Sequence, residues 1–287
     1  LPWVYEVRGQ LERTWLASLP VGDRAAGAAS ERYALLRAKE TEMMLAADQV
    51  VTLGETLRED LVLRGVPPER VTVVPNAVDA ALLDVRLDPA QARGRVNLPE
   101  EGFWVGTVSS LVDYEGLDAL LDAVALLRAE GLDVRLALVG DGVSRSALET
   151  RAARLGLGQA AVLPGRVGSQ ETALWHRALD VFVVPRRDLE VCRVVTPLKP
   201  MEAMAAGRPV IASDLPALAE VVRRPDTGVM VPPGDVNALA AAIRSLASDA
   251  LARARYGERG RAFAATRTWA AHGQRYREVY ESLAGAP

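Results

Sequence analysis

Short hydrophobic segments alternate with amphipathic helical stretches along most of this chain. Residues 103–108, 134–139 and 181–184 are typical of buried strands. An apolar stripe at helical spacing follows the first of them: Leu117, Leu120, Leu121, Val124 and Leu127. This alternation favours parallel sheets whose strands are joined by crossover helices. The expected fold class is therefore α/β, and residues 102–265 are predicted to form a complete, doubly wound domain.

The N-terminal part carries a shorter version of the same pattern. Its strand-like segments are too few for a comfortable sheet and lie at 3–7, 50–53 and 71–74. The chain starts at Leu1, in a strand-like run, without an initiator Met. We expect residues 1–84 to be a partial domain that is completed by a missing N-terminal segment of the same protein. The periodicity fades after it, so residues 85–101 are predicted to be a linker.

The composition excludes several classes of protein. Hydrophobic residues make up 49% and charged residues 25% of the chain, which is ordinary for a globular protein. The net charge of −3 and the lack of a basic block give no reason to expect a nucleic-acid partner. No run of about 18 apolar residues occurs, so no transmembrane segment is expected. With Cys192 as the single cysteine, no intrachain disulfide forms, and a cytoplasmic location fits best. The Arg and Ala bias suggests a GC-rich bacterial coding sequence.

The segment from residue 185 to residue 202 carries the strongest signal for a ligand. In open α/β sheets, ligands bind beyond the carboxyl ends of the strands, and this segment follows the most hydrophobic strand. We predict that a helix opens at Thr196-Pro197 and runs through Ala206. Free amides of its first turn, with Lys199 and Arg193, suit an anion such as a diphosphate. Only Lys39 and Lys199 are lysines among 34 basic residues, which is a mild hint that an ammonium is wanted at position 199.

Glu202 lies one turn beyond Lys199, where its carboxylate could accept bonds from both hydroxyls of a ribose. The alternative is an ordinary surface pair, because Lys and Glu at this spacing are common on helices.

Five segments in sequence order resemble family 4 retaining glycosyltransferases, which have the GT-B fold. Residues 196–214, which read TPLKPMEAMAAGRPVIASD, resemble the donor-binding segment of that family. Residues 138–142 (LVGDG), 163–167 (LPGRV) and 180–185 (DVFVVP) resemble its strand ends, and residues 71–79 (VTVVPNAVD) resemble the segment that closes its N-terminal domain. The resemblance implies two Rossmann-like, doubly wound domains, of which the N-terminal one is incomplete here. Residues 266–287 would form a helix that crosses back to the N-terminal domain.

The same resemblance implies an activity and a donor site. A sugar would pass from a nucleoside-diphosphate-sugar donor to the hydroxyl of an unknown acceptor, with retention of configuration. The family needs neither a metal nor another cofactor. Glu202 would bind the ribose, and the backbone of Arg166 and Val167 would contact the base. The remaining donor-binding positions are Ser110, Gly140, Thr196, Pro197, Leu198 and Lys199, of which the last two would bind the diphosphate.

The chain departs from the family at three charged positions. Many members carry a glutamate eight residues before the second one, and here Val194 occupies that place. Many also have Arg and Lys where this chain has Ser110 and Glu115. We expect Lys199 and Arg193 to compensate and Glu190 to approach the missing glutamate's place, so Lys199, Arg193 and Glu190 are the candidate catalytic residues. These losses leave open a non-catalytic nucleotide-sugar-binding protein. A nucleotide-dependent epimerase or dehydrogenase is a weaker alternative, because no Gly-x-Gly-x-x-Gly opens a helix.

Glu6 and Arg8 end the first predicted strand and are candidates for the acceptor side, although an ordinary strand-end turn explains them equally well. His176 and His272 are expected to be surface or packing residues. Cys192 is expected to fill apolar space.

Overall fold

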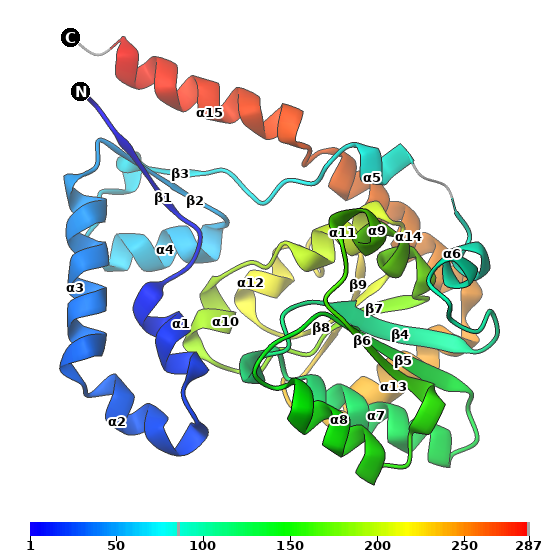
Figure 1. The fold of residues 1–287 in the computed structure, drawn as a ribbon. Coiled ribbons are helices and arrows are strands. Elements are labelled where there is room, and N and C mark those ends of the chain that lie inside the picture. The colour runs from blue at the N-terminus through cyan, green and yellow to red at the C-terminus, as the bar shows by residue number, and fades with distance from the viewer. Residues whose placement is uncertain (85–86, 286–287) are drawn as a thin grey trace.

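The computed structural model describes residues 1–84 and 87–285, and in these residues the strands form two parallel sheets (Figure 1). The small sheet has the order β1-β2-β3, with bounds Val4–Val7, Gln49–Thr52 and Val71–Val73. The large sheet has the order β6-β5-β4-β7-β8-β9. Its strands, in chain order from β4 to β9, are Phe103–Val108, Val134–Val139, Ala161–Gly165, Val181–Val184, Val210–Ser213 and Gly228–Val231. The predicted α/β class with parallel sheets is confirmed.

Helices connect the strands in both parts of the chain. In the first part they are α1 (Leu11–Ser18), α2 (Arg24–Ala28), α3 (Glu31–Ala46), α4 (Glu55–Leu63), α5 (Ala81–Asp84) and α6 (Pro89–Arg95). In the second part they are α7 (Leu117–Ala129), α8 (Arg145–Arg154), α9 (Ser169–Ala178), α10 (Glu190–Val194), α11 (Lys199–Ala205), α12 (Pro216–Ala219), α13 (Val236–Ser248), α14 (Ala250–Ala265) and α15 (Trp269–Ala284). Within the described residues, no helix has the combined length and apolar character that crossing a membrane requires.

The large sheet is covered by helices on both faces. Alternate residues of β7 separate the two layers: Val181 and Val183 pack in the cluster with α7, α8 and α13, whereas Phe182 and Val184 pack in the cluster with α9, α11 and α14. A strand buried on both faces reads as a continuous hydrophobic run, which is why β7 was recognisable from its sequence.

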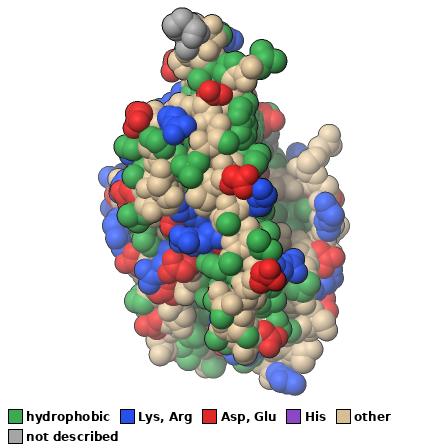
Figure 2. All heavy atoms as spheres, turned by 90° about the vertical axis from the view of Figure 1, so that its left-hand side faces the viewer, with side chains coloured by type: hydrophobic (Ala, Val, Ile, Leu, Met, Phe, Trp, Pro, Cys, Tyr) green, Lys and Arg blue, Asp and Glu red, His purple; other side chains and the backbone are tan. Residues whose placement is uncertain are grey.

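The small sheet is covered on one face by α3 and α4 and on the other by the last helix. Val50 belongs to the apolar cluster of α3 and α4, whereas Val51 packs with Val279 of α15. Tyr276 of α15 also donates a hydrogen bond of 2.6 Å from its hydroxyl to Glu6. The final helix therefore contacts the small sheet, whose strands are far from it in sequence (Figure 1). Figure 2 shows the outer face of this part of the molecule, where Lys and Arg side chains are interspersed with Asp and Glu.

Part of the segment predicted as a linker is helical. The Asp88 carboxylate caps α6 by accepting from the Gln91 amide at 2.8 Å, and Pro89 fits the first turn because it needs no amide partner there. Arg93 of α6 is buried and forms an ion pair of 2.5 Å with Asp180. Helix α6 was not predicted because its buried side includes a charged residue, which interrupts the apolar periodicity typical of a helix. Residues 85 and 86 of the predicted linker lie outside the described residues.

Candidate functional site

The order of strands in the large sheet places a topological switch point at the carboxyl ends of β4 and β7, where doubly wound sheets form a crevice. The chain leaves β4 toward β5 on one side and reaches β7 on the other, so their following loops diverge. Such a switch point is where doubly wound sheets bind ligands. The loop after β4 leads to Glu115, and the loop after β7 begins with Pro185 and Arg186. Both loops therefore deliver charged residues to this crevice.

Glu115 is a buried carboxylate held between two cations. Arg186 Nη2 and Lys199 Nζ each lie 2.9 Å from Glu115 Oε1. Burial would raise the pKa of Glu115, but Arg186 and Lys199 outweigh it and lower that pKa to about 2. Burial opposes the charged form of Arg186, yet Glu115 raises its pKa overall. The cluster therefore holds one anion and two cations, and its excess positive charge suits an anionic ligand.

The backbone around Glu115 is built for close approach to the loop after β7. Gly116 has a φ of 67°, and a Cβ there would collide with the Pro185 carbonyl. The Arg187 amide donates to the Tyr114 carbonyl at 3.0 Å. These contacts fix Glu115 against Arg186. Arg186 lies in the segment 185–202 that was predicted to bind a ligand, but it was not predicted as the partner of Glu115.

The helix predicted to open at Thr196-Pro197 begins three residues later, at Lys199, and this corrects the prediction. A residue that precedes proline disfavours helical backbone, so Thr196 stays outside the helix, and Pro200 takes the early position that needs no amide partner. Thr196 is buried, and its carbonyl accepts from Asn76 Nδ2 at 2.9 Å. Pro197 is buried as well, whereas Leu198 is the N-cap residue and is half-buried. The first turn therefore presents Leu198 and Lys199 rather than Thr196 and Pro197.

Glu202 lies one turn into α11, beside a buried histidine. His176 Nε2 is 3.5 Å from Glu202 Oε2, and the imidazole packs on Phe182 with ring centroids 5.2 Å apart. His176 is 1% exposed, so it is a packing residue rather than a surface one. Neither of its ring nitrogens has a hydrogen-bond partner among the described residues. Its place beside Glu202 escaped the sequence analysis because it depends on how α9 packs on α11.

The other two candidate catalytic residues lie on α10 and face other partners. Arg193 forms a two-pronged ion pair with Asp188, at 2.5 and 2.7 Å, and is exposed. Glu190 is exposed, and its carboxylate is 4.0 Å from Arg13 of α1. The structure therefore places Arg186, rather than Arg193, beside Lys199.

The remaining donor-binding candidates line the ends of β4, β5 and β6. Gly140 has a φ of 133°, and a Cβ there would collide with the Ser109 carbonyl, so the turn requires glycine. Ser110 and Arg166 are exposed, and Val167 is half-buried. They share the carboxyl edge of the large sheet with Lys199 and Glu202.

Two hydrogen-bonded contacts join the small sheet to this edge. Arg8 Nη2 donates to Asn76 Oδ1 at 3.0 Å, and Asn76 in turn donates to the Thr196 carbonyl. Near the end of α12, the Glu220 carboxylate accepts from the Thr56 amide at 2.6 Å, at the start of α4. Asn76 lies in the recognised segment 71–79, but its partner could not be predicted from the sequence.

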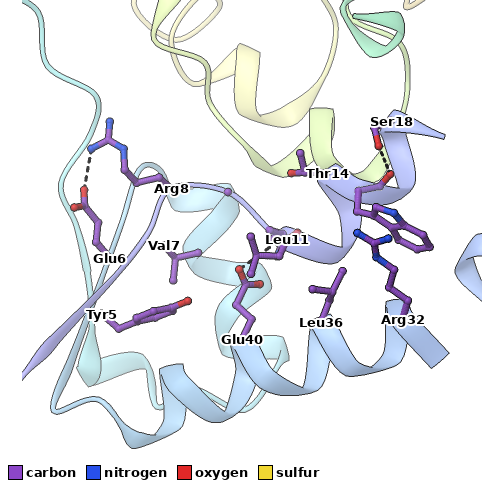
Figure 3. Close-up of a pocket in the computed structure, with 13 residues that line it drawn as sticks. Tyr5, Glu6, Val7, Arg8, Leu11, Thr14, Ser18, Arg32, Leu36 and Glu40 are labelled. Atoms are coloured by element: carbon purple, nitrogen blue, oxygen red, sulfur yellow. Dashed lines mark hydrogen bonds and ion pairs between the residues drawn. The ribbon is translucent and has the colours of Figure 1, made fainter. Parts of the chain in front are cut away.

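Glu6 and Arg8 line a hollow of about 580 Å³ at the end of β1 (Figure 3). The two side chains form an ion pair of 2.9 Å. Figure 3 shows Glu40 of α3 on the opposite side, near Leu11. This hollow presents polar groups beside the small sheet, where the acceptor side was predicted.

Two parallel sheets, with the Glu115, Arg186 and Lys199 cluster at the switch point of the larger one, define a doubly wound α/β protein. Residues 102–249 match the family model described as "Glycosyl transferases group 1", and residues 14–82 match the one described as "Glycosyltransferase Family 4". The chain belongs to this glycosyltransferase family.

Individual relatives agree with this assignment. The chain is 31% identical over 252 residues to D-inositol 3-phosphate glycosyltransferase of Thermobispora bispora, covering 84% of this chain and 57% of the relative. It thus spans a little over half the length of that relative. The fold resembles that of sucrose-phosphate synthase from Thermosynechococcus elongatus, with a TM-score of 0.82 and 25% identity over 99% of this chain and 68% of that one. Anabaena HepE in complex with UDP-glucose has a TM-score of 0.80 at 21% identity, covering 98% and 72%. The two-domain GT-B fold class is therefore confirmed.

Proposed function

We propose that this chain carries the donor site of a retaining glycosyltransferase, which moves a sugar from a nucleoside diphosphate to an acceptor hydroxyl. The observation that carries the proposal is the position of Lys199 and Glu202, one turn apart on α11 at the switch point of the large sheet. The family assignment supports the activity, and the resemblance to a fold solved with UDP-glucose supports the class of donor.

In this proposal Lys199 and the amides at the start of α11 face the diphosphate, and Arg186 adds a second positive charge. Lys199 is half-buried, and burial lowers its pKa although Glu115 opposes that effect. A partly desolvated ammonium interacts more strongly with an anion than a fully hydrated one does. Arg186 and Lys199 supply the charge, so the proposal includes no metal ion or other cofactor.

The reaction follows from this charge distribution. The bond between the anomeric carbon and the diphosphate oxygen breaks while the acceptor oxygen bonds to the same carbon on the same face. The acceptor proton passes to the departing diphosphate. Negative charge grows on the diphosphate during this step, so a fixed cation stabilises the transition state more than the ground state.

Glu202 is proposed to accept hydrogen bonds from the ribose, while the backbone of Arg166 and Val167 contacts the base. The acceptor is proposed to enter from the side of Glu6 and Arg8. The chain of contacts from Arg8 through Asn76 to Thr196 supports this orientation, because it links the hollow beside β1 to the loop that precedes α11.

Calorimetric titration with UDP and with GDP tests the donor site. We expect one of them to bind, and Glu202→Gln to weaken it about tenfold, as loss of a charged hydrogen-bond acceptor does. The 2′,3′-dideoxy form of the same nucleotide should bind the wild type and Glu202→Gln equally. If neither nucleotide binds, or if Glu202→Gln loses affinity equally for the dideoxy form, the assignment of α11 is wrong.

A non-catalytic nucleotide-sugar-binding protein is the second candidate, favoured by the engagement of Lys199 with Glu115 and by Val194 in place of a glutamate. Release of nucleoside diphosphate from the nucleotide sugar distinguishes the two candidates. Binding without turnover in the presence of polyol and sugar acceptors would favour this alternative.

A further inference from the structure

A second hollow, of about 400 Å³, lies at the opposite edge of the large sheet and is lined by three arginines, Arg177, Arg208 and Arg261. Arg177 is on α9 just before β7, and Arg208 precedes β8. Both therefore lie at the amino ends of parallel strands whose carboxyl ends face the donor crevice. The hollow is a separate site on the sheet.

Arg177 is the anomalous residue of this hollow. It is 1% exposed, and among the described residues no carboxylate lies within 4.0 Å of it. Its Nη2 donates to the Leu82 carbonyl, whereas its buried Nε has no partner in the described part of the chain. Burial, together with Arg208 and Arg261, lowers the pKa of Arg177 to about 10. A buried cation normally has an anionic partner, because desolvation of the charge is otherwise uncompensated.

The other two arginines add to the same positive field. Arg208 donates from Nε and Nη1 to the carbonyls of Ala206 and Leu179, each at 3.2 Å, and neither acceptor is charged. Arg261 is half-buried on α14, and the described residues provide no ion pair for it. Two carboxylates, Asp88 and Glu258, also line the hollow. Three cations against two carboxylates leave an excess of positive charge.

A close backbone contact between α14 and the turn that ends α11 places Arg261 at this hollow. A Cβ at Gly257 would collide with the Gly207 carbonyl, so α14 rests directly on the turn that ends α11. Arg261 lies one helical turn after Gly257 and therefore on the same side of α14. A Cβ at Gly207 would meet no atom within 4 Å, so the turn leaves open space beside the arginines.

We propose that this hollow binds a small phosphate-bearing anion through Arg177, Arg208 and Arg261, independently of the donor crevice. Planar guanidinium groups suit this ligand because each offers several donors in a fixed arrangement to phosphate oxygens. The bound anion supplies the partner that Arg177 lacks.

Calorimetry with inorganic pyrophosphate and with inorganic phosphate, at low ionic strength, tests the proposal on the intact chain. The informative variant is Arg261→Gln, because Arg261 is half-buried and its loss leaves the core intact. Arg255→Gln is the matched control, since Arg255 is exposed on the same helix and outside the hollow. Lys199→Ala removes a cation of the donor crevice and separates binding at the two sites.

We expect the wild type, Arg255→Gln and Lys199→Ala to bind one of the two anions at this hollow, and Arg261→Gln to bind it about tenfold more weakly. Equal affinity in Arg261→Gln and the wild type would overturn the proposal, as would complete loss of anion binding in Lys199→Ala.

Thermal unfolding of Arg177→Met gives a second test. Without the anion, this variant should unfold at or above the melting temperature of the wild type. Pyrophosphate should not raise its melting temperature. If pyrophosphate raises the melting temperature of Arg177→Met as much as that of the wild type, the proposal is contradicted. Because these ligands carry no nucleoside, failure here leaves nucleotide binding at α11 as a separate result.

Discussion

The large and the small sheet each bury an ionic cluster, and the two clusters have opposite charge balance. At the large sheet, the single carboxylate of Glu115 meets two cations. Beside the small sheet, two cations meet three carboxylates: Arg64 pairs with Glu12, Glu40 and Asp60, and Arg13 lies 2.7 Å from Asp60. Burial raises the pKa of Glu40, to which the neighbouring Asp60 carboxylate adds, and burial lowers the pKa of Arg64.

Under the proposed function, this difference distinguishes a cluster that only stabilises the fold from one that also binds the donor. The acid-rich group joins α1, α3 and α4, and it repels an incoming diphosphate. The cation-rich group lies at the switch point, and in the proposed function the diphosphate of the donor completes its charge balance. The sign of the excess charge therefore supports the proposal that the donor diphosphate binds beside Arg186 and Lys199.

The largest effect is expected for Arg64→Met. This change leaves Glu12 and Glu40 buried without their cation, and breaking a buried pair in this way costs about 3–5 kcal/mol of unfolding free energy. Urea denaturation measures the loss. Arg58→Met, on α4 with an ion pair of 3.7 Å at the surface, is the control and should cost less than about 1 kcal/mol. Equal losses in the two variants would show that the acid-rich cluster does not stabilise the fold.

The next effect is on catalysis. Lys199→Ala should lower the turnover of nucleotide sugar about 100-fold, because the ammonium stabilises charge that grows in the transition state. Affinity for the donor should fall less than tenfold. Lys39→Ala is the matched control, since Lys39 is an exposed lysine paired with Glu42. Unchanged turnover in Lys199→Ala would remove the catalytic role from the cation-rich cluster.

The two clusters should also respond to pH with opposite signs. The pKa of Glu115 is lowered from 4.5 to about 2, so its ionised form stabilises the fold above pH 4.5, and this stability is lost as the pH falls through about 2. The loss is roughly 3 kcal/mol at full protonation. The pKa of Glu40 is raised, so its contribution declines as the pH rises above 4.5.

Unfolding free energies between pH 2 and pH 7 test this difference. Glu115→Gln should reduce the pH dependence of the unfolding free energy below pH 4.5. Glu40→Gln should reduce this dependence above pH 4.5. The same change of slope in both variants would contradict the opposite charge balance.

The smallest expected effect concerns the histidine beside α11. His176→Phe should weaken nucleoside diphosphate binding about threefold, because it removes the polar ring whose Nε2 lies 3.5 Å from the Glu202 carboxylate. The effect should vanish with a 2′,3′-dideoxy nucleotide. His272→Phe, which replaces a buried histidine on α15, serves as the control. Equal weakening of normal and dideoxy nucleotides would assign His176 to packing alone.

Several features of the fold were predictable because their signals are local. The strand at 181–184 is buried on both faces, so its hydrophobic run alone identifies it. The final helix was predicted from residue 266 and begins close to it, at Trp269, where Thr268 caps α15 by accepting from the Ala271 amide. The start of α11 was predicted three residues too early, because Pro197 and Pro200 both suit a first helical turn and the structure places Pro200 there.

The candidate site was predictable only in part. Lys199 and Glu202 are one turn apart in sequence, so their common position on α11 follows from helix geometry. The pairing of Lys199 with Glu115, 84 residues away, has no local signal. Arg186 was not predicted as a site residue for the same reason, since its partner Glu115 lies 71 residues away.

Sequence alone determined the α/β class, the strands of the large sheet and the segment that carries Lys199 and Glu202, because periodicity and proline chemistry act over a few residues. Tertiary structure decided the strand order, and with it which loops meet at the switch point. It also decided which buried charges share a partner, because Coulomb interactions depend on distances between elements that lie far apart in the chain.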